Sequence, residues 1–113
     1  MKLIIAYIRP EKLPDVKRAL FKAEVYAMSV LDALGSGQQK GYTTMYRGTL
    51  SEVNLLRKVR LEIAVNDDFE EKTVDAILEG AYQGQMGDGM IFILDLPKLV
   101  RIRTKERTGQ ALR

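Results

Sequence analysis

The segment from Lys58 to Val65 alternates between apolar and polar side chains more cleanly than any other part of the chain. Its apolar members are Val59, Leu61, Ile63 and Val65, and the intervening residues are Lys58, Arg60, Glu62 and Ala64. Because successive side chains of a strand point to opposite faces, this pattern predicts a strand with one buried face and one charged face. We therefore expect a sheet that is covered by helices on one face only.

The residues before this strand predict two more strands with a helix between them. Residues 3–8 form a short continuous apolar run, which is typical of a buried strand, and residues 27–34 predict a second strand. Between the two, apolar residues recur at helical spacing at Leu13, Val16, Leu20 and Ala23. Pro14 falls in the first turn of that helix, where its missing N–H costs little.

The residues after the alternating strand repeat this plan. Asp68 and Glu71 predict a capping box at the start of a second helix. The buried stripe of that helix is predicted to consist of Val74, Ile77, Leu78 and Ala81. Residues 90–94 predict another strand, and the alternation of residues 100–103 predicts a short extra one.

This order of elements predicts the fold class. It is an α+β, ferredoxin-like βαββαβ sandwich with both helices on one face of an antiparallel sheet. The chain has 113 residues, and we expect a single domain over residues 1–113. Residues 36–56, between the second and third strands, lack periodicity. Loops of about twenty residues are usually functional, although a misread hairpin is the alternative.

The composition narrows the possible chemistry. The chain has no Cys and no His, which excludes thiolate nucleophiles, Ser-His-Asp triads and the commonest metal ligands. Its net charge of +3 suits an anionic ligand, although a solvated surface of mixed charge is the alternative. No apolar run approaches the ~20 residues that span a membrane, and no signal peptide is recognised, so we expect a cytoplasmic protein.

Two features could form an anion site. Lys58 and Arg60 lie on the uncovered sheet face, and the glycines of residues 84–89 allow backbone N–H groups to converge on a phosphate. Arg101 and Arg103 would share one face of the short last strand. The alternatives are a salt-bridged surface for the cations and an ordinary helix stop followed by a turn for the glycines.

The motifs taken together resemble the PII nitrogen-regulatory signalling proteins over nearly the whole chain. They are Ile8-Arg9-Pro10 with Lys12-Leu13 and Val16-Lys17, Gly37-x-Gln39-Lys40-Gly41, Tyr46-Arg47-Gly48, Gly84-x-x-Gly87-Asp88-Gly89-x-Ile91-Phe92 and Arg101-Ile102-Arg103-Thr104. Each motif is modest, but their joint occurrence in this order is specific.

The resemblance implies a homotrimer that signals and is not an enzyme. Such proteins bind ATP or ADP in clefts between subunits, and bind 2-oxoglutarate together with Mg²⁺ and ATP. Their long loop, here residues 36–56, docks on ammonium channels, enzymes or transcription regulators. The resemblance does not imply nucleic-acid binding or membrane insertion.

The resemblance also implies site residues. The nucleotide would contact Ser29, Gly35, Gly37, Gln39, Lys58, Glu62, Ala64, Gly87, Asp88, Gly89, Arg101 and Arg103. Gln39 would complete the Mg²⁺ shell, and Gln39 and Lys58 would bind 2-oxoglutarate. The resemblance implies that Gly87, Asp88, Gly89, Arg101 and Arg103 hold the phosphates from across the subunit boundary.

Three residues depart from the PII pattern. Met90 replaces a phosphate-binding Lys or Arg, and Gln38 replaces an Arg, so we expect weaker ATP binding or an altered nucleotide preference. Ser51 replaces the Tyr that many bacterial members uridylylate, so we expect no uridylylation there. A divergent PII-like nucleotide sensor for another pathway is therefore an alternative function.

Two unrelated functions share this fold. An acylphosphatase-type enzyme needs an Asn that positions water, and neither Asn54 nor Asn66 lies in the expected motif. An RNA-recognition module needs two or three aromatic residues on the open sheet face, where the third strand offers Lys58, Arg60 and Glu62. Both functions are weaker predictions than a nucleotide-binding regulator.

Overall fold

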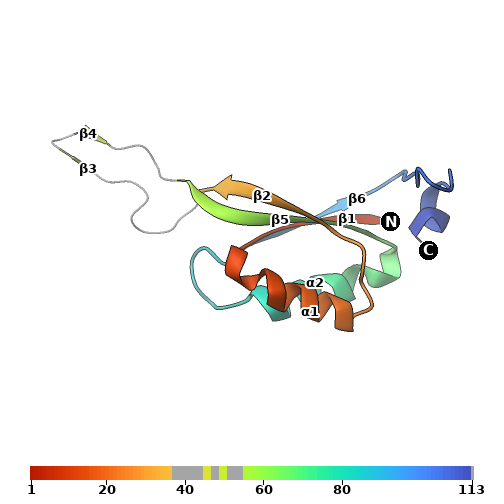
Figure 1. Ribbon diagram of the computed structural model, residues 1–113, viewed down its shortest axis with the longest axis horizontal. Helices are drawn as coiled ribbons and strands as arrows, with labels where there is room; N and C mark the ends of the chain where they lie inside the picture. The colour runs from red at the N-terminus through yellow and green to blue at the C-terminus, as the bar shows by residue number, and fades with distance from the viewer. Residues whose placement is uncertain (37–44, 47–48, 51–54, 113) are drawn as a thin grey trace.

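The computed structural model describes residues 1–36, 45–46, 49–50 and 55–112 of the chain. Its main elements are β1 (Lys2–Ile8), α1 (Leu13–Lys22), β2 (Ser29–Gly35), β5 (Leu56–Val65), α2 (Glu70–Ala81) and β6 (Gly89–Asp95). Short 3₁₀ turns lie at Pro10–Lys12, Asp67–Phe69 and Thr108–Leu112, and two-residue strands at β3 (Met45–Tyr46) and β4 (Thr49–Leu50). Figure 1 shows this order along the chain.

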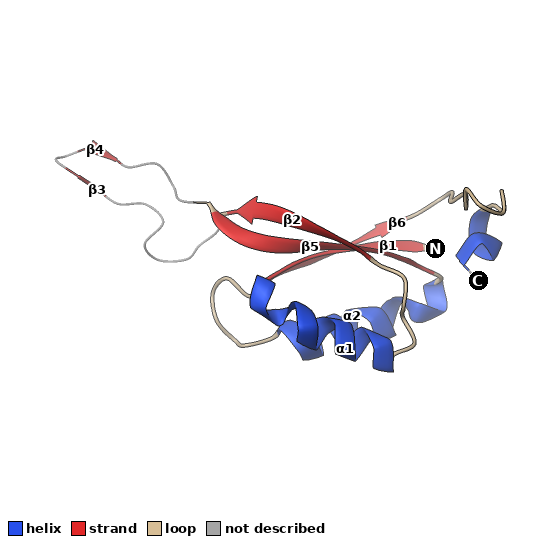
Figure 2. Ribbon diagram, viewed as in Figure 1, coloured by secondary structure: helices blue, strands red, loops and turns tan. Residues whose placement is uncertain are grey.

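The four long strands form one antiparallel sheet in the order β2-β5-β1-β6. Both helices lie on the same face of this sheet, as Figure 2 shows. The predicted α+β fold with a βαββαβ order is therefore confirmed, and β5 is the alternating strand from which the prediction began.

The core lies between the sheet and the two helices. The alternation of β5 buries Val59, Leu61, Ile63 and Val65, as predicted. The other fully buried apolar side chains of large volume are Ile4 and Ile8 from β1, Val16 and Leu20 from α1, and Ile77 from α2. The opposite face of the sheet has no helix over it in the described part of the chain, so its side chains remain available for contacts.

The two helices approach closely at Gly80 of α2. A Cβ atom added there would lie 2.5 Å from the Cα of Val16, which is backbone and cannot move aside as a side chain would. We expect Gly80→Ala to lower the free energy of unfolding by about 1–3 kcal/mol, because overpacking exceeds the gain of about 1 kcal/mol in helix propensity. Urea unfolding checks this, with the exposed Glu79→Ala as control; a stabilised Gly80→Ala variant would contradict it.

The predicted start of α2 is wrong. Residues Asp67–Phe69 form a 3₁₀ turn, so α2 begins only at Glu70, and no side chain caps it. Asp67 instead pairs with the N-terminal ammonium group at 2.9 Å. Thr73 donates a hydrogen bond from its Oγ1 to the Phe69 carbonyl oxygen at 2.7 Å, which satisfies a buried hydroxyl inside the first turn.

Two further predictions about the second half are wrong. Leu78 is 49% exposed, because it lies toward β6, the edge strand of the sheet, where no other element of the described ranges covers α2. Residues 101–104 form a turn and not a strand. Their backbone bonds run locally, from the Arg101 N–H to the Glu106 carbonyl and from the Lys105 N–H to the Arg101 carbonyl, and Val100 makes a single bridge to Arg107.

The long connection between the second and third strands of the sheet is confirmed. β2 ends at Gly35 and β5 begins at Leu56, and these two residues pair across the ladder. Within the connection, β3 and β4 pair only with each other, so it contains a short hairpin as well. None of the helices in the described ranges is both long and apolar enough to cross a membrane.

Candidate functional site

The glycine loop between α2 and β6 lies beside the end of β1. Because β1 and β6 are antiparallel neighbours, with Ile8 opposite Gly89, the residue that follows β1 is brought next to the loop. Ile8 also pairs with Val59 on β5, which brings Lys58 to the same end of the sheet. Three separate elements therefore deliver Arg9, Lys58 and the loop to one place.

Asp88 organises the backbone of this loop. Its Oδ2 accepts hydrogen bonds from the N–H groups of Gln83 and Gly84, both at 2.8 Å, and from that of Gln85 at 3.4 Å. The nest of amides predicted from the glycines is therefore present, but it surrounds a carboxylate of the protein itself.

The same contacts set the ionisation of Asp88. Burial of the carboxyl group opposes ionisation, but the three amides and Arg9 outweigh burial and hold the pKa of Asp88 below its usual value. A depressed carboxyl pKa stabilises the fold above the ordinary pKa of Asp. That contribution is lost as the pH falls through the folded-state value.

Two cations hold the carbonyl groups of the loop. Lys58 donates from Nζ to the Gly87 oxygen at 2.7 Å, and Arg9 donates from Nη2 to the Met86 oxygen at 2.6 Å. Arg9 also approaches Asp88, with 3.4 Å between Nε and Oδ1. Burial of the Lys58 ammonium group lowers the pKa of Lys58, and repulsion from Arg9 lowers it further. Two carboxylates, Glu11 and Asp88, attract Lys58 electrostatically, so the two cations at this end of the sheet are balanced by nearby acidic groups.

Two glycines complete this end of the sheet. Gly89 has φ +115°, and a Cβ atom there would lie 1.7 Å from the Tyr7 carbonyl oxygen, so only glycine fits. A Cβ atom on Gly35 would lie 3.5 Å from Cγ of Lys58, which places the end of β2 against the same cluster. We call the group formed by Arg9, Gly35, Lys58 and residues 87–89 the loop half-site.

The remaining described site residues lie at the other end of the sheet. Ser29 of β2 pairs with Glu62 of β5, and Ala64 and Arg101 line a common cavity of about 300 Å³. Arg101 donates from Nε to the Ala111 oxygen at 2.8 Å, and Arg103 is exposed in the adjoining turn. We call this group, Ser29, Glu62, Ala64, Arg101 and Arg103, the arginine half-site. At about 3.3 Å per strand residue, Ala64 lies roughly 20 Å along β5 from Lys58.

The sheet face between the half-sites is not a free cationic surface. Arg60 donates to the Tyr7 hydroxyl at 2.7 Å and to Glu62 Oε2 at 3.0 Å. Tyr7 in turn meets Phe92 edge to face, with 6.2 Å between ring centroids. The salt-bridged reading is therefore confirmed for Arg60, and this face has two aromatic residues that inspection of the third strand alone did not reveal.

Several predicted residues lie outside the described part of the chain. They are Gly37, Gln38, Gln39 and Ser51. The roles of Gln39 toward Mg²⁺ and 2-oxoglutarate, and the absence of uridylylation at Ser51, therefore stay predictions. Within the described residues, no group of three or more acidic side chains could hold a metal ion.

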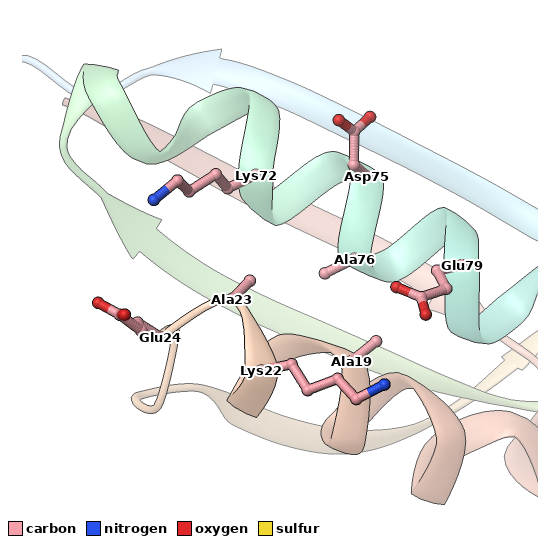
Figure 3. A pocket seen from close by; sticks show the side chains of 8 residues that line it. All are labelled: Ala19, Lys22, Ala23, Glu24, Lys72, Asp75, Ala76 and Glu79. Carbon is pink, nitrogen blue, oxygen red and sulfur yellow. The ribbon is translucent and has the colours of Figure 1, made fainter.

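Two other cavities lie outside both half-sites for most of their extent. An apolar groove of about 490 Å³ runs between α2 and β6, and its lining includes Leu78, Tyr82, Met90 and Ile93. Figure 3 shows the second, a depression of about 390 Å³ between α1 and α2 with an alanine floor and rims of Lys and acidic residues. The apolar groove between α2 and β6 reaches Asp88 and Gly89, so it adjoins the loop half-site.

Comparison with known proteins gives a consistent result. The family described as Nitrogen regulatory protein P-II matches residues 1–106. The chain is 48% identical to nitrogen regulatory protein GlnK1 of Methanosarcina mazei, over 99% of this chain and 97% of the relative. It is 44% identical to nitrogen regulatory protein P-II of Klebsiella oxytoca and 40% identical to nitrogen regulatory protein GlnK of Escherichia coli K12, in both cases over 99% of this chain and 100% of the relative.

Proposed function

Because the chain belongs to the nitrogen regulatory protein P-II family of signal-transduction regulators, we propose that it senses ATP and ADP in clefts between its subunits. Its relatives are named as regulators and not as enzymes, which agrees with a sensing role. The occupied cleft then changes the shape of residues 36–56, and this loop acts on a target protein of nitrogen metabolism.

The separation of the two half-sites carries this proposal. One subunit places the loop half-site and the arginine half-site at opposite ends of β5, with Arg60 between them and paired to Glu62 of the arginine half-site. A head-to-tail contact between copies brings the loop half-site of one copy beside the arginine half-site of the next. A ring of three such contacts forms three equivalent clefts, each with cations on both sides of a bound phosphate chain.

Exposed apolar surface supports the ring. Met90 is 62% exposed, and Leu78 and Ile93, which line the same groove along the sheet edge, are about half exposed. Apolar surface of this kind on a small domain marks an interaction site, and burial against a second copy would stabilise the assembly. Light scattering is expected to give the mass of a trimer; a monomer at micromolar concentration would contradict the ring.

The residues of the two half-sites would have separate roles in such a cleft. Lys58 and Arg9 attract the phosphates or the carboxylate of 2-oxoglutarate, and Arg101 and Arg103 approach from the neighbouring copy. Mg²⁺ prefers oxygen ligands, and the described residues offer no acidic cluster for it. The metal would therefore rely on phosphate oxygens and on the Gln39 carboxamide, so 2-oxoglutarate should bind only with Mg²⁺ and ATP present.

Calorimetry tests this function directly. ATP and ADP are each titrated into the protein, and 2-oxoglutarate is then titrated with and without Mg²⁺ and ATP. We expect both nucleotides to bind at one site per subunit and to compete with each other. Absence of any nucleotide binding would overturn the proposal, whereas 2-oxoglutarate binding without nucleotide would overturn only the metal-dependent step.

Met90 provides a test of the phosphate side. It lies next to Gly89 at the loop half-site, on the uncovered sheet face, where it adds no charge. We expect Met90→Lys to tighten ATP binding by roughly 10- to 100-fold, because one charge-assisted hydrogen bond contributes about 1.5–3 kcal/mol. Phe21→Lys on the outer face of α1 adds the same charge elsewhere and should have little effect. Equal affinity in Met90→Lys and wild type would contradict this placement of the phosphates.

A further inference from the structure

We infer that Asp88 is a positioning residue of the nucleotide cleft, whose carboxylate is a built-in anion that shapes residues 83–88 and never touches the ligand itself. This inference rests on the proposed function, because it assigns a role within the same cleft. The observation behind it is that the carboxylate already lies inside the amide nest that a phosphate would otherwise enter.

The contacts of the carboxylate point inward. Oδ2 accepts hydrogen bonds from the N–H groups of Gln83, Gly84 and Gln85, and Oδ1 accepts one from Nε of Arg9. The Asp88 N–H is also used, since it donates to the Gln85 carbonyl at 3.2 Å. With its side chain only 21% exposed, the residue is directed at its own loop and not at the open sheet face.

This arrangement decides which groups remain for a ligand. The amides of Gln83, Gly84 and Gln85 that surround Asp88 cannot also bind a phosphate, so on this side of the cleft the side-chain donors left for the ligand are the two cations. Both cations take their positions from the loop, because Lys58 is bonded to the Gly87 oxygen and Arg9 to the Met86 oxygen. Asp88 therefore acts on the ligand through a chain of contacts, from carboxylate to loop backbone to ammonium and guanidinium groups.

If the Asp88 carboxylate contacted the ligand directly, its removal would have different effects on nucleotide binding. A carboxylate that faced the phosphates would repel them, and its removal would tighten binding of a metal-free nucleotide. A carboxylate that held Mg²⁺ would make the effect of its removal depend on the metal. A positioning role instead predicts weaker binding whether or not Mg²⁺ is present.

The experiment compares Asp88→Ala and Asp88→Asn with wild type by calorimetry, using ATP and adenosine, each with and without Mg²⁺. We expect Asp88→Ala to weaken ATP binding by roughly 10- to 100-fold in both conditions, as for the loss of one charge-assisted hydrogen bond. Adenosine, which has no phosphates, should bind equally well to all three. Asp88→Asn keeps an oxygen acceptor for the amides and should retain most of the affinity.

Controls separate this inference from its alternatives. Asp75→Ala removes an exposed carboxylate of α2 that lines the depression between α1 and α2 (Figure 3), and should leave ATP binding unchanged. Equal losses for ATP and adenosine, an effect seen only with Mg²⁺, or unchanged ATP affinity in Asp88→Ala would each overturn the positioning role.

A second measurement keeps the inference testable by itself. If wild type binds no nucleotide, the proposed function fails, but hydrogen exchange of the Gln83, Gly84 and Gln85 amides still reports on the loop. Faster exchange at these amides in Asp88→Ala than in Asp75→Ala supports the shaping of the loop by the carboxylate. Equal exchange rates in the two variants would overturn it.

Discussion

Gly89→Ala is expected to lower the free energy of unfolding by about 3–5 kcal/mol. The added Cβ atom would lie 1.7 Å from the Tyr7 carbonyl oxygen, and the residue would keep a φ of +115° that L-residues rarely adopt. Backbone strain of this kind costs about 1–3 kcal/mol, and overpacking adds a similar amount. The clash involves the backbone of β1, so relief requires the β1–β6 ladder to separate near Ile8.

Urea unfolding measures this effect, and the chain offers a matched control. A Cβ atom on Gly35 would meet Lys58 Cγ at 3.5 Å, which is an ordinary contact, so Gly35→Ala should stay within about 1 kcal/mol of wild type. Similar urea midpoints for Gly89→Ala and Gly35→Ala would contradict the backbone conformation described for Gly89 at the start of β6.

Lys58→Met is expected to weaken ATP binding by roughly 100-fold, the second large effect. Methionine keeps most of the aliphatic stem of lysine but removes its charge, so packing changes little. The variant loses a charge-assisted hydrogen bond to the ligand, worth about 1.5–3 kcal/mol, and also releases the Gly87 carbonyl. The loss should therefore fall near the upper end of the range for a single bond.

Calorimetry with ATP checks this expectation, with Lys17→Met on the exposed face of α1 as the matched control. The control removes the same charge from the surface and should change the affinity by less than about threefold at moderate salt. An unchanged ATP affinity in Lys58→Met would mean that the phosphates do not approach the end of β5.

The sheet could be predicted from local patterns because its strands alternate or are continuously apolar. β5 shows why this works, since its buried residues from Val59 to Val65 alternate with partly exposed ones. The start of α2 could not, because Asp67 is bound to the N-terminal ammonium group, which is distant in sequence. The turn after Leu99 is closed by local bonds of the Arg101 and Lys105 N–H groups, which the alternation of residues 100–103 does not indicate.

The candidate site was predicted in part. The resemblance placed Lys58 and the glycine loop together, and the structure brings them into contact. Arg9 belongs to the Ile8-Arg9-Pro10 motif of the resemblance but was not among the predicted site residues. The antiparallel pairing of β1 with β6 was a signal that could have revealed it, because this pairing puts the residue after Ile8 beside Asp88. The side-chain role of Asp88 depends on loop geometry that no spacing of residues encodes.

In the proposed ring, the division of the cleft into two half-sites would link nucleotide occupancy to subunit association. A dissociated subunit would retain each half-site but no complete cleft, so dilution below the dissociation constant of the ring should release bound nucleotide. Conversely, each nucleotide bound across a boundary contributes its binding free energy to holding two subunits together. One variant can carry substitutions in the loop half-site and another in the arginine half-site. Mixed rings of the two variants would then contain intact clefts wherever an unsubstituted loop half-site meets an unsubstituted arginine half-site.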